Sequence, residues 1–525
     1  MTSVRATENE HGWQIALLLM LALALRLEFT FLPITDAFSW REASTSMMAD
    51  NLPKNGWNPL WPEVSWTGDQ PGYQGREFQF LTIFAALLNA AFGWTDWSGR
   101  LVAALFGTIT TYSLFRLINI LFGRREGLAS ALFYAVLPGA IVIDSAYLPD
   151  PGMLALQVTA LWCLAEAVSP GARQPRRWYI LAAIFGAMAI LAKLPAVTAL
   201  LPACYLVCSS AKNASRRRSM TMLAGVLVLI GIPIIAYYKW AVYLGTHYPP
   251  FHVAGTGWIW EEGLSSYWDN GFYLGSFYKH ITAWLWGPVA IVLMCLALVS
   301  GSNGKAVKEE IAGRWFLELW LLGCAIFYFM AALELEDNSW NLHVFNPVVA
   351  ALAARGCLAV VSSRSAMRAR IQILVLVLLS LTLSREGVVA KKRLDHEGDY
   401  LLGMHLQILS KPGDLVIASG IDTGTPLPIY YSRRRGWLFP TPEMAPNRDY
   451  AIFSEDGDKA IADLNNLVAR GARWFGVAKY GRDQSPQGEK FTEHYRILMQ
   501  YLENHAFLAG ETKTHIIYDL APLRH

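Results

Sequence analysis

Long apolar stretches constrain this chain more than any other feature of its sequence. A helix needs about 20 mostly apolar residues to cross roughly 30 Å of hydrocarbon. Stretches of this kind run from Arg100 to Phe122, Thr221 to Trp240, Ile281 to Ser300 and Trp315 to Leu333. Charged residues make up only 16% of the 525 positions, against about 25% in soluble domains. The sequence therefore predicts a multispan α-helical membrane protein.

The distribution of Lys and Arg predicts how the chain is oriented, because short cytoplasmic loops carry an excess of these residues. The basic segments are Gly123-Arg124-Arg125, Gly171 to Arg177, Lys212 to Arg218, Lys305 to Arg314 and Arg364 to Arg370. Pairs of apolar segments fit every interval between them. The segments thereby placed outside are Asp144 to Pro151, the corner at Lys193, Tyr243 to Lys279 and Glu334 to His343. We predict about eleven spans in the cell's inner (plasma) membrane.

One apolar segment, Phe78 to Phe92, does not fit a full span. It has only about 15 residues, fewer than a crossing needs. If it crossed, the loop around Asp36 and the loop around Asp150 would lie on opposite sides, or the basic loops would face outward. We therefore interpret it as an interfacial or re-entrant helix.

The composition changes after the last predicted span, about Ile371 to Leu383. Lys391 to His525 is polar and has no segment able to cross. Strand patterns at Leu415 to Ser419 and Trp474 to Ala478 flank a helical pattern at Lys459 to Arg470, which predicts a small α/β domain. The expected organisation is a transmembrane catalytic domain, 1–390, with a first outer loop at 34–99, followed by an extracytoplasmic domain, 391–525, that acts as a lid or docking module.

A charged cluster directly follows the first apolar segment, Trp13 to Pro33. It contains Asp36, Arg41 and Glu42, and Glu77 follows later in the same loop. Charges at the exit of a span are costly to hold near lipid, so they mark a functional site by default. A carboxylate here could accept a proton from a substrate hydroxyl, and the arginine could pair with phosphate. The alternative is a structural salt bridge at the membrane edge.

Three further polar residues fall on the predicted outer side. Asp150 lies between two prolines. It is either a helix-start residue, or it shares a polar site with Asp36 and binds a cation or a sugar hydroxyl. Lys193 either reaches to lipid headgroups or supplies a cation for a lipid phosphate. His343 is an interfacial cap or a second donor. Two carboxylates with two cationic or donor groups suit an anionic lipid-linked substrate.

The long outer loop, Tyr243 to Lys279, is rich in Trp, Tyr and Gly and contains Glu261, Glu262 and Asp269. Aromatic side chains stack on sugar rings, and they are also enriched at the membrane interface. Both interpretations stay open for this loop.

Several segments together resemble a known family. They are TDAFSWREASTSMMADN, GREFQFLTIFAALLNAAFG, SAYLPDP, LAKLPAVTALLP and NSWNLHVFNPVVAALAARG. In order and spacing, over about residues 13 to 360, they are similar to the bacterial GT-C glycosyltransferases of the protein mannosyltransferase and aminoarabinose transferase type. The resemblance implies a multispan enzyme with a catalytic aspartate in its first outer loop, amphipathic helices in that loop, and a polyprenyl-phosphate sugar as donor.

Carried onto this sequence, the resemblance implies that Asp36 is the catalytic base and Asp150 the second-loop carboxylate. Lys193 and His343 fall where the family contacts the donor phosphate. Two positions depart from the family pattern. Ala37 stands where many relatives have a second acidic residue, and Val344-Phe345 replaces the usual acidic-tyrosine or paired-tyrosine continuation.

The implied reaction is attack of an acceptor hydroxyl or amine on the anomeric carbon of a lipid phosphosugar, with inversion and loss of polyprenyl phosphate. The leaving group is already charged, so no metal is required, although a divalent cation between Asp36 and Asp150 stays open. The expected partners are the donor lipid, a glycan, lipid or protein acceptor, and membrane lipids, but no nucleic acid.

Two other function classes remain. A glycan polymerase or ligase should rely on arginine-rich outer loops, whereas the segment from Tyr243 to His280 contains no arginine. A transporter should have pseudo-symmetric halves with broken spans and midplane charges, and the sequence has neither.

Overall fold

The computed structural model describes residues 12–524 except 170, 171, 173, 211–214, 254–276, 301–312, 332–334, 336, 337, 362–365, 423, 441–456 and 480–486. The chain forms two compact units. The first contains Met1–Phe31, Arg100–Tyr237 and Gly255–Lys391, and the second contains Leu32–Gly99, Tyr238–Ala254 and Lys392–His525. The first outer loop, 34–99, thus lies in the same compact unit as the C-terminal segment, Lys392–His525.

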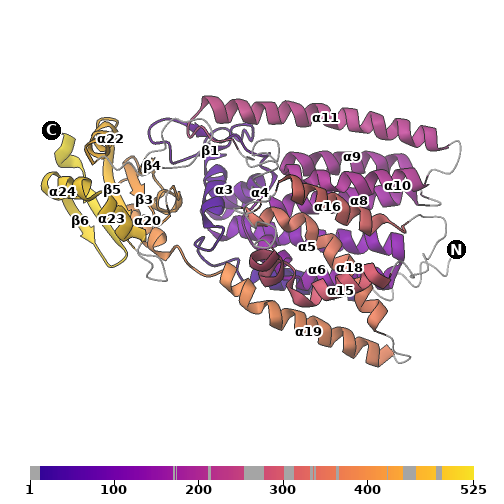
Figure 1. Ribbon diagram of the computed structural model, residues 1–525. Coiled ribbons are helices and arrows are strands. Elements are labelled where there is room, and N and C mark those ends of the chain that lie inside the picture. Colours follow the sequence, from indigo (N-terminus) through magenta and orange to yellow (C-terminus); the bar gives the residue numbers. More distant parts are fainter. Residues whose placement is uncertain are drawn as a thin grey trace. The chain divides into compact units, whose positions relative to one another are not determined.

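The first unit is helical (Figure 1). Its α-helices are α2 (Gly12–Leu27), α5 (Trp97–Phe122), α6 (Arg124–Val136), α7 (Pro138–Asp144), α8 (Asp150–Val168), α9 (Pro175–Ala192), α10 (Leu200–Ser210), α11 (Ser215–His247), α15 (Gly287–Ser300), α16 (Phe316–Met330), α18 (Asn346–Val360) and α19 (Ala366–Lys391). It also contains the 3₁₀-helices η1 (Leu194–Ala199) and η3 (Ser339–Phe345) and the π-helix η2 (Phe277–Leu285). The last turns of α11 and the first of α5 belong to the second unit.

Among the described residues, five helices are long and apolar enough to cross a membrane, or seven if each of two bent pairs counts as one span. Shorter apolar helices include Gly12–Leu27, Leu194–Ser209 and Phe316–Met330. These helices confirm a multispan membrane protein, and the total of eleven spans stays a prediction. The segment interpreted as interfacial forms its own 13-residue helix, α4 (Phe80–Phe92).

Proline and glycine explain where helices bend and where they pack closely. Leu137, in an extended conformation before Pro138, separates α6 from α7, which lie at 62°; the residue before a proline disfavours helix. Gly287 has φ +72° at the 97° bend between η2 and α15. Gly356 brings α18 against α15, because a Cβ there would lie 1.9 Å from the carbonyl oxygen of Leu293.

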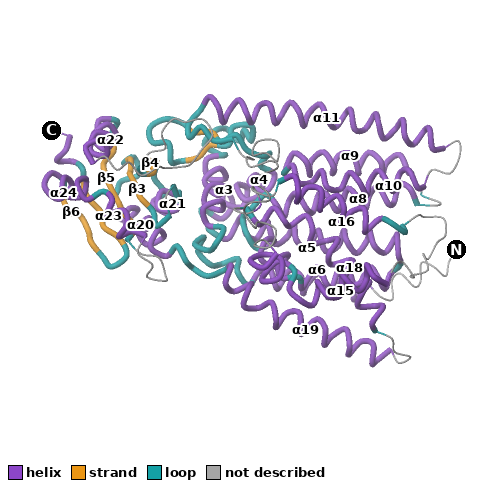
Figure 2. The backbone as a smooth tube through the Cα atoms, in the orientation of Figure 1, coloured by secondary structure: helices purple, strands orange, loops and turns teal. Residues whose placement is uncertain are grey.

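The second unit contains a mixed five-stranded sheet with helices on both faces (Figure 2). The strand order is β4 (Arg435–Leu438), β3 (Leu415–Ser419), β5 (Ala472–Ala478), β7 (His515–Asp519) and β6 (Phe507–Glu511). β3 pairs in parallel with β4 and β5, and β7 pairs antiparallel with β5 and β6. The helices are α20 (Glu397–Leu409), α21 (Leu427–Ser432), α22 (Gly457–Ala469), α23 (Gln487–His494) and α24 (Arg496–His505). The two predicted strands and the predicted helix are confirmed.

The first outer loop shares a hydrophobic core with this sheet. The loop contains α3 (Ser39–Asn51), α4 and the short pair β1 (Glu63–Val64) and β2 (Gly72–Tyr73). Ile34, Met47 and Val64 from the loop are buried in one cluster with Leu402 of α20 and Ile517 of β7. A second cluster, on α22, α23 and α24, covers the other face of the sheet. Because both faces are buried, the central strands are nearly continuous apolar runs.

Candidate functional site

In the first unit, Lys193 and Asp150 form an ion pair. The Lys193 ammonium donates to both carboxylate oxygens of Asp150, at 2.9 and 2.8 Å. Asp150 is fully buried and begins α8 with Pro151 beside it, which confirms that it is a helix-start residue. Lys193 is 14% exposed and caps the C-terminus of α9 in an extended conformation. The lysine is therefore held at the point where α9 turns into η1.

A second buried cluster in the same unit surrounds Asp144, the first residue of the motif that contains Asp150. Arg26 and Tyr134 donate to one carboxylate oxygen, each at 3.0 Å, and His343 lies 2.9 Å from the other. The second ring nitrogen of His343 is 2.8 Å from the amide of Asn346. Arg26, Asp144 and His343 are completely buried. His343 thus has both nitrogens engaged inside the helices, as a link between η3 and α7.

In the second unit, Asp36 is 1% exposed and its two carboxylate oxygens are held separately. The backbone N–H of Phe38 donates to Oδ1 at 3.0 Å, just before α3 begins. The ammonium of Lys392 donates to Oδ2 at 3.2 Å. This pair is itself buried, with side-chain exposures of 1% for Lys392 and 2% for Asp36. An ammonium this close favours the ionised form of a carboxylate.

Four other charged residues of the first outer loop, Arg41, Glu42, Arg76 and Glu77, are also buried. Arg41 forms an ion pair with Glu77, and Glu42 is 0% exposed. Nearby, Gln74 accepts from Arg76 at 2.6 Å. Two of the residues predicted to bind substrate, Arg41 and Glu77, are therefore paired with each other.

His252, from the described part of the long outer loop, lies close enough to Arg41 to feel its charge. Burial and then the charge of Arg41 lower its pKa to about 4. The imidazole is therefore neutral at pH 7. Glu261, Glu262 and Asp269, which the sequence analysis named in the same loop, lie outside the described residues.

The fit of a divalent cation can be judged from the donors present. Hard cations take several oxygen ligands at once, whereas Asp36 and Asp150 each accept from a lysine ammonium. Throughout the described ranges, no group of three or more His, Cys, Asp or Glu side chains is arranged to hold a metal ion. At Asp36 and at Asp150, the lysine ammonium contacts carboxylate oxygens that a cation would need.

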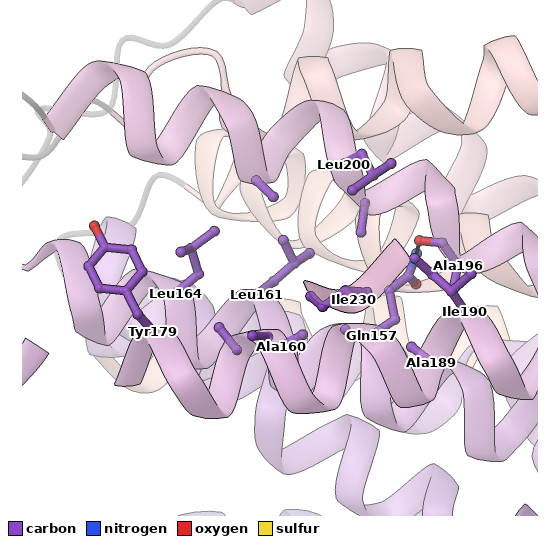
Figure 3. Close-up of a pocket in the computed structure, with 15 residues that line it drawn as sticks. Gln157, Ala160, Leu161, Leu164, Tyr179, Ala189, Ile190, Ala196, Leu200 and Ile230 are labelled. Carbon is purple, nitrogen blue, oxygen red and sulfur yellow. Dashed lines mark hydrogen bonds between the residues drawn. The ribbon is translucent and has the colours of Figure 1, made fainter. Parts of the chain in front are cut away.

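An apolar cavity of about 110 Å³ lies between α8, α9, η1, α10 and α11 (Figure 3). Tyr179 stands at one end, and Gln157 and Ala196 at the other. The amide of Gln157 donates to the Ala196 carbonyl at 3.1 Å and to the Thr198 hydroxyl at 2.9 Å. The cavity is lined by Ile190, three residues before Lys193. Its walls suit a hydrocarbon chain.

Sequence reasoning missed three charged residues of these clusters. Arg26 had a usable signal, because it is the only charge in the apolar helix α2. Asp144 likewise ends an apolar run. Lys392 gave no such signal: it lies 356 residues from its partner Asp36, in a segment that reads as an ordinary polar linker.

A family model and several solved structures match this chain. Residues 80–237 match the family described as dolichyl-phosphate-mannose-protein mannosyltransferase. ArnT from Cupriavidus metallidurans, in the apo state, has a TM-score of 0.64 at 12% identity, and ArnT bound to undecaprenyl phosphate has 0.61 at 11%. Each match covers 98% of this chain and 99% of ArnT. No curated protein sequence matches significantly.

The oligosaccharyltransferase AglB from Archaeoglobus fulgidus, in complex with an inhibitory peptide and a dolichol-phosphate, has a TM-score of 0.59 at 13% identity. That match covers 98% of this chain and 74% of AglB. Because all these identities are low, the solved structures establish the fold of this chain and nothing more about it. Family model and fold together confirm the predicted resemblance to GT-C glycosyltransferases of the protein mannosyltransferase and aminoarabinose transferase type.

Proposed function

We propose that this protein is an integral-membrane glycosyltransferase that moves a sugar from a polyprenyl-phosphate carrier to an acceptor outside the cytoplasm. The observation that carries the proposal is the family-model match at residues 80–237, on a chain whose fold agrees with ArnT over 98% of its length. The solved ArnT contains undecaprenyl phosphate. A lipid-phosphate sugar is therefore the donor class that we assign to this chain.

The reaction assigned to Asp36 is general-base catalysis. Its carboxylate accepts the proton of the acceptor hydroxyl or amine as that atom bonds to the anomeric carbon. The bond from the anomeric carbon to the phosphate oxygen breaks, and its electron pair leaves with the polyprenyl phosphate. A single displacement of this kind inverts the anomeric centre. The ammonium of Lys392 beside Asp36 supports this role, because a nearby positive charge favours the carboxylate form that can accept a proton.

Lys193 is the best candidate to stabilise the leaving phosphate. It is the more accessible partner of its ion pair, and Asp150 would hold it in position. The adjacent apolar cavity would receive part of the prenyl chain. Arg41 and His343 are weaker candidates, because Arg41 is paired with Glu77 and His343 with Asp144.

The test is release of polyprenyl phosphate by purified protein in nanodiscs from a panel of lipid phosphosugars, with membrane lipids, glycans and peptides as acceptors. We expect release with one donor class by wild type and a loss of at least about 100-fold with Asp36→Asn, because the base contributes about 10²–10⁴-fold. Asp414→Asn, in the turn before β3, is the matched control and should keep wild-type activity. Equal rates for Asp36→Asn and wild type would exclude Asp36 as the base.

A glycan ligase is the second candidate, favoured by the similarity to AglB, an oligosaccharyltransferase. A panel that also contains lipid-linked oligosaccharides separates the two. Transfer of whole oligosaccharides without transfer of single sugars would assign the ligase reaction.

A further inference from the structure

The C-terminal segment, Lys392–His525, contacts Asp36 and the residues on both sides of it. Lys392, its first residue, donates to Asp36 Oδ2. Four residues later, the backbone N–H of His396 donates to the carbonyl of Thr35 at 3.1 Å. The backbone N–H of Ile34 donates to the Tyr431 hydroxyl at 2.6 Å. Residues on the N-terminal side of Asp36 are therefore bound directly by residues that follow position 391.

The C-terminal side of Asp36 is bound as well. The indole N–H of Trp40, in the first turn of α3, donates to the carbonyl of Gly424 at 2.8 Å. The aromatic ring of Phe38, whose N–H holds Oδ1, lies 5.6 Å from the Lys392 ammonium. The carboxylate of Asp36 thus has one oxygen fixed by its own loop and one by the C-terminal segment.

Other contacts tie the rest of the first outer loop to the same segment. The hydroxyls of Tyr430 and Tyr431 donate to the two oxygens of Asp96, at 2.9 and 3.1 Å, near the end of the loop. Arg435 of β4 pairs with Glu63 of β1 in its middle. The loop is therefore held at its start, its middle and its end, which a detachable lid would not require.

We propose that Lys392 is a positioning residue for Asp36, and that the C-terminal segment is thereby part of the catalytic apparatus. This inference rests on the proposed role of Asp36 as the base. The ammonium fixes the orientation of the carboxylate and keeps it ionised while the second oxygen stays on the Phe38 N–H. Catalytic groups need this fixed geometry, since a displacement of 1 Å can cost about 10²-fold in rate.

The test compares Lys392→Met and Lys392→Arg with wild type, in nanodiscs, by kcat and KM for the donor. We expect Lys392→Met to lower kcat on the order of 10- to 100-fold with little change in KM, because Lys392 orients the base and does not bind donor. Lys392→Arg keeps the positive charge and should recover most of kcat. Lys391→Met removes the neighbouring lysine, whose ammonium lies 5.0 Å from the Trp284 ring, and should leave kcat unchanged.

A double variant separates positioning from a general effect on structure. If Lys392 acts through Asp36, then adding Lys392→Met to Asp36→Asn should cause no further loss of the residual rate, because coupled residues are not additive. Independent, multiplicative losses would overturn the inference. The double variant also removes both charges of the buried pair, so it stays interpretable if Lys392→Met alone does not fold.

The remaining outcomes distinguish this inference from the proposed function. Full kcat in folded Lys392→Met, together with inactive Asp36→Asn, would overturn the positioning role and leave Asp36 as the base. Full activity of Asp36→Asn would exclude Asp36 as the base, and the positioning role of Lys392 would fall with it, while sugar transfer itself would still be observed. A rise in KM with unchanged kcat would assign Lys392 to donor binding and would also overturn the inference.

Discussion

Both aspartates that the sequence analysis placed at the centre of catalysis lie against lysines. Charges are taken out of water at a large desolvation cost, which a partner at hydrogen-bond distance offsets. Removing one partner of such a pair typically costs about 3–5 kcal/mol, because the other charge stays buried and unpaired. For the Lys193–Asp150 and Lys392–Asp36 pairs, replacing the lysine by arginine keeps the aspartate paired and is therefore more informative than replacing it by alanine.

Asp50 of α3 provides a test of electrostatics in the first outer loop. Asn89 and Trp94 donate to its oxygens at 3.0 and 2.9 Å. Burial raises its pKa from 3.8 to about 6, although Lys54 and Arg433 act in the opposite direction. The folded state therefore holds this proton more tightly than the unfolded state does.

The sign of the pH effect follows from that difference. The contribution of Asp50 to stability is greatest below about pH 4 and is lost as the pH rises from about 4 to 6, by roughly 3 kcal/mol. Asp50→Asn cannot ionise, so its melting temperature should fall less than that of wild type over this range. The measurement is thermal unfolding in nanodiscs at pH 4 to 7. Parallel curves for the two proteins would contradict the prediction.

At the scale of single elements, local hydrophobic patterns predicted secondary structure correctly where the burial of one face decides it. The apolar run at Leu415 to Ser419 and the segment at Phe80 to Phe92 formed the expected strand and short helix. The sequence could not reveal which elements share a core, since the contact between Asp36 and Lys392 spans most of the chain. It also could not show that Asp144 would engage His343, because no periodicity records a pairing across 199 residues.

Close helix packing in the first unit depends on Gly356. A Cβ at this position would lie 1.9 Å from the carbonyl oxygen of Leu293 in α15. A backbone carbonyl cannot rotate away from such a clash as a side chain can. Gly356→Ala should therefore lower stability by about 1–3 kcal/mol, measured as a lower melting temperature in detergent. Gly231→Ala in α11 is the control: no atom lies within 4 Å of its Cβ, so better helix propensity should leave it neutral or more stable.

At the scale of the whole molecule, the second unit is assembled from three separate parts of the chain, 32–99, 238–254 and 392–525. Tyr431 connects two of them twice, because its hydroxyl accepts from Ile34 and donates to Asp96. These two positions lie near opposite ends of the first outer loop. One hydroxyl thus contacts residues near both ends of the loop.

Tyr431→Phe tests this connection. We expect faster hydrogen exchange for residues 32–52 and a lower kcat, since a hydrogen bond to a charged group contributes about 1.5–3 kcal/mol. Tyr501→Phe removes a similar hydroxyl, which donates to Asn465 at 3.2 Å on the surface, and should change neither quantity. Unchanged exchange in Tyr431→Phe would show that the shared apolar core and the other polar contacts hold the loop without this hydroxyl.

The core shared by the first outer loop and the sheet also contains residues that are synthesised at very different times. Ile34 and Met47 are synthesised more than 400 residues before Ile517, their neighbour in the same cluster. At about 5–20 residues per second, the wait lasts roughly tens of seconds. During that time the segment around Asp36 has no finished surface to pack on. A polypeptide that stops before β7 would therefore lack part of the sheet face against which Ile34 and Met47 pack.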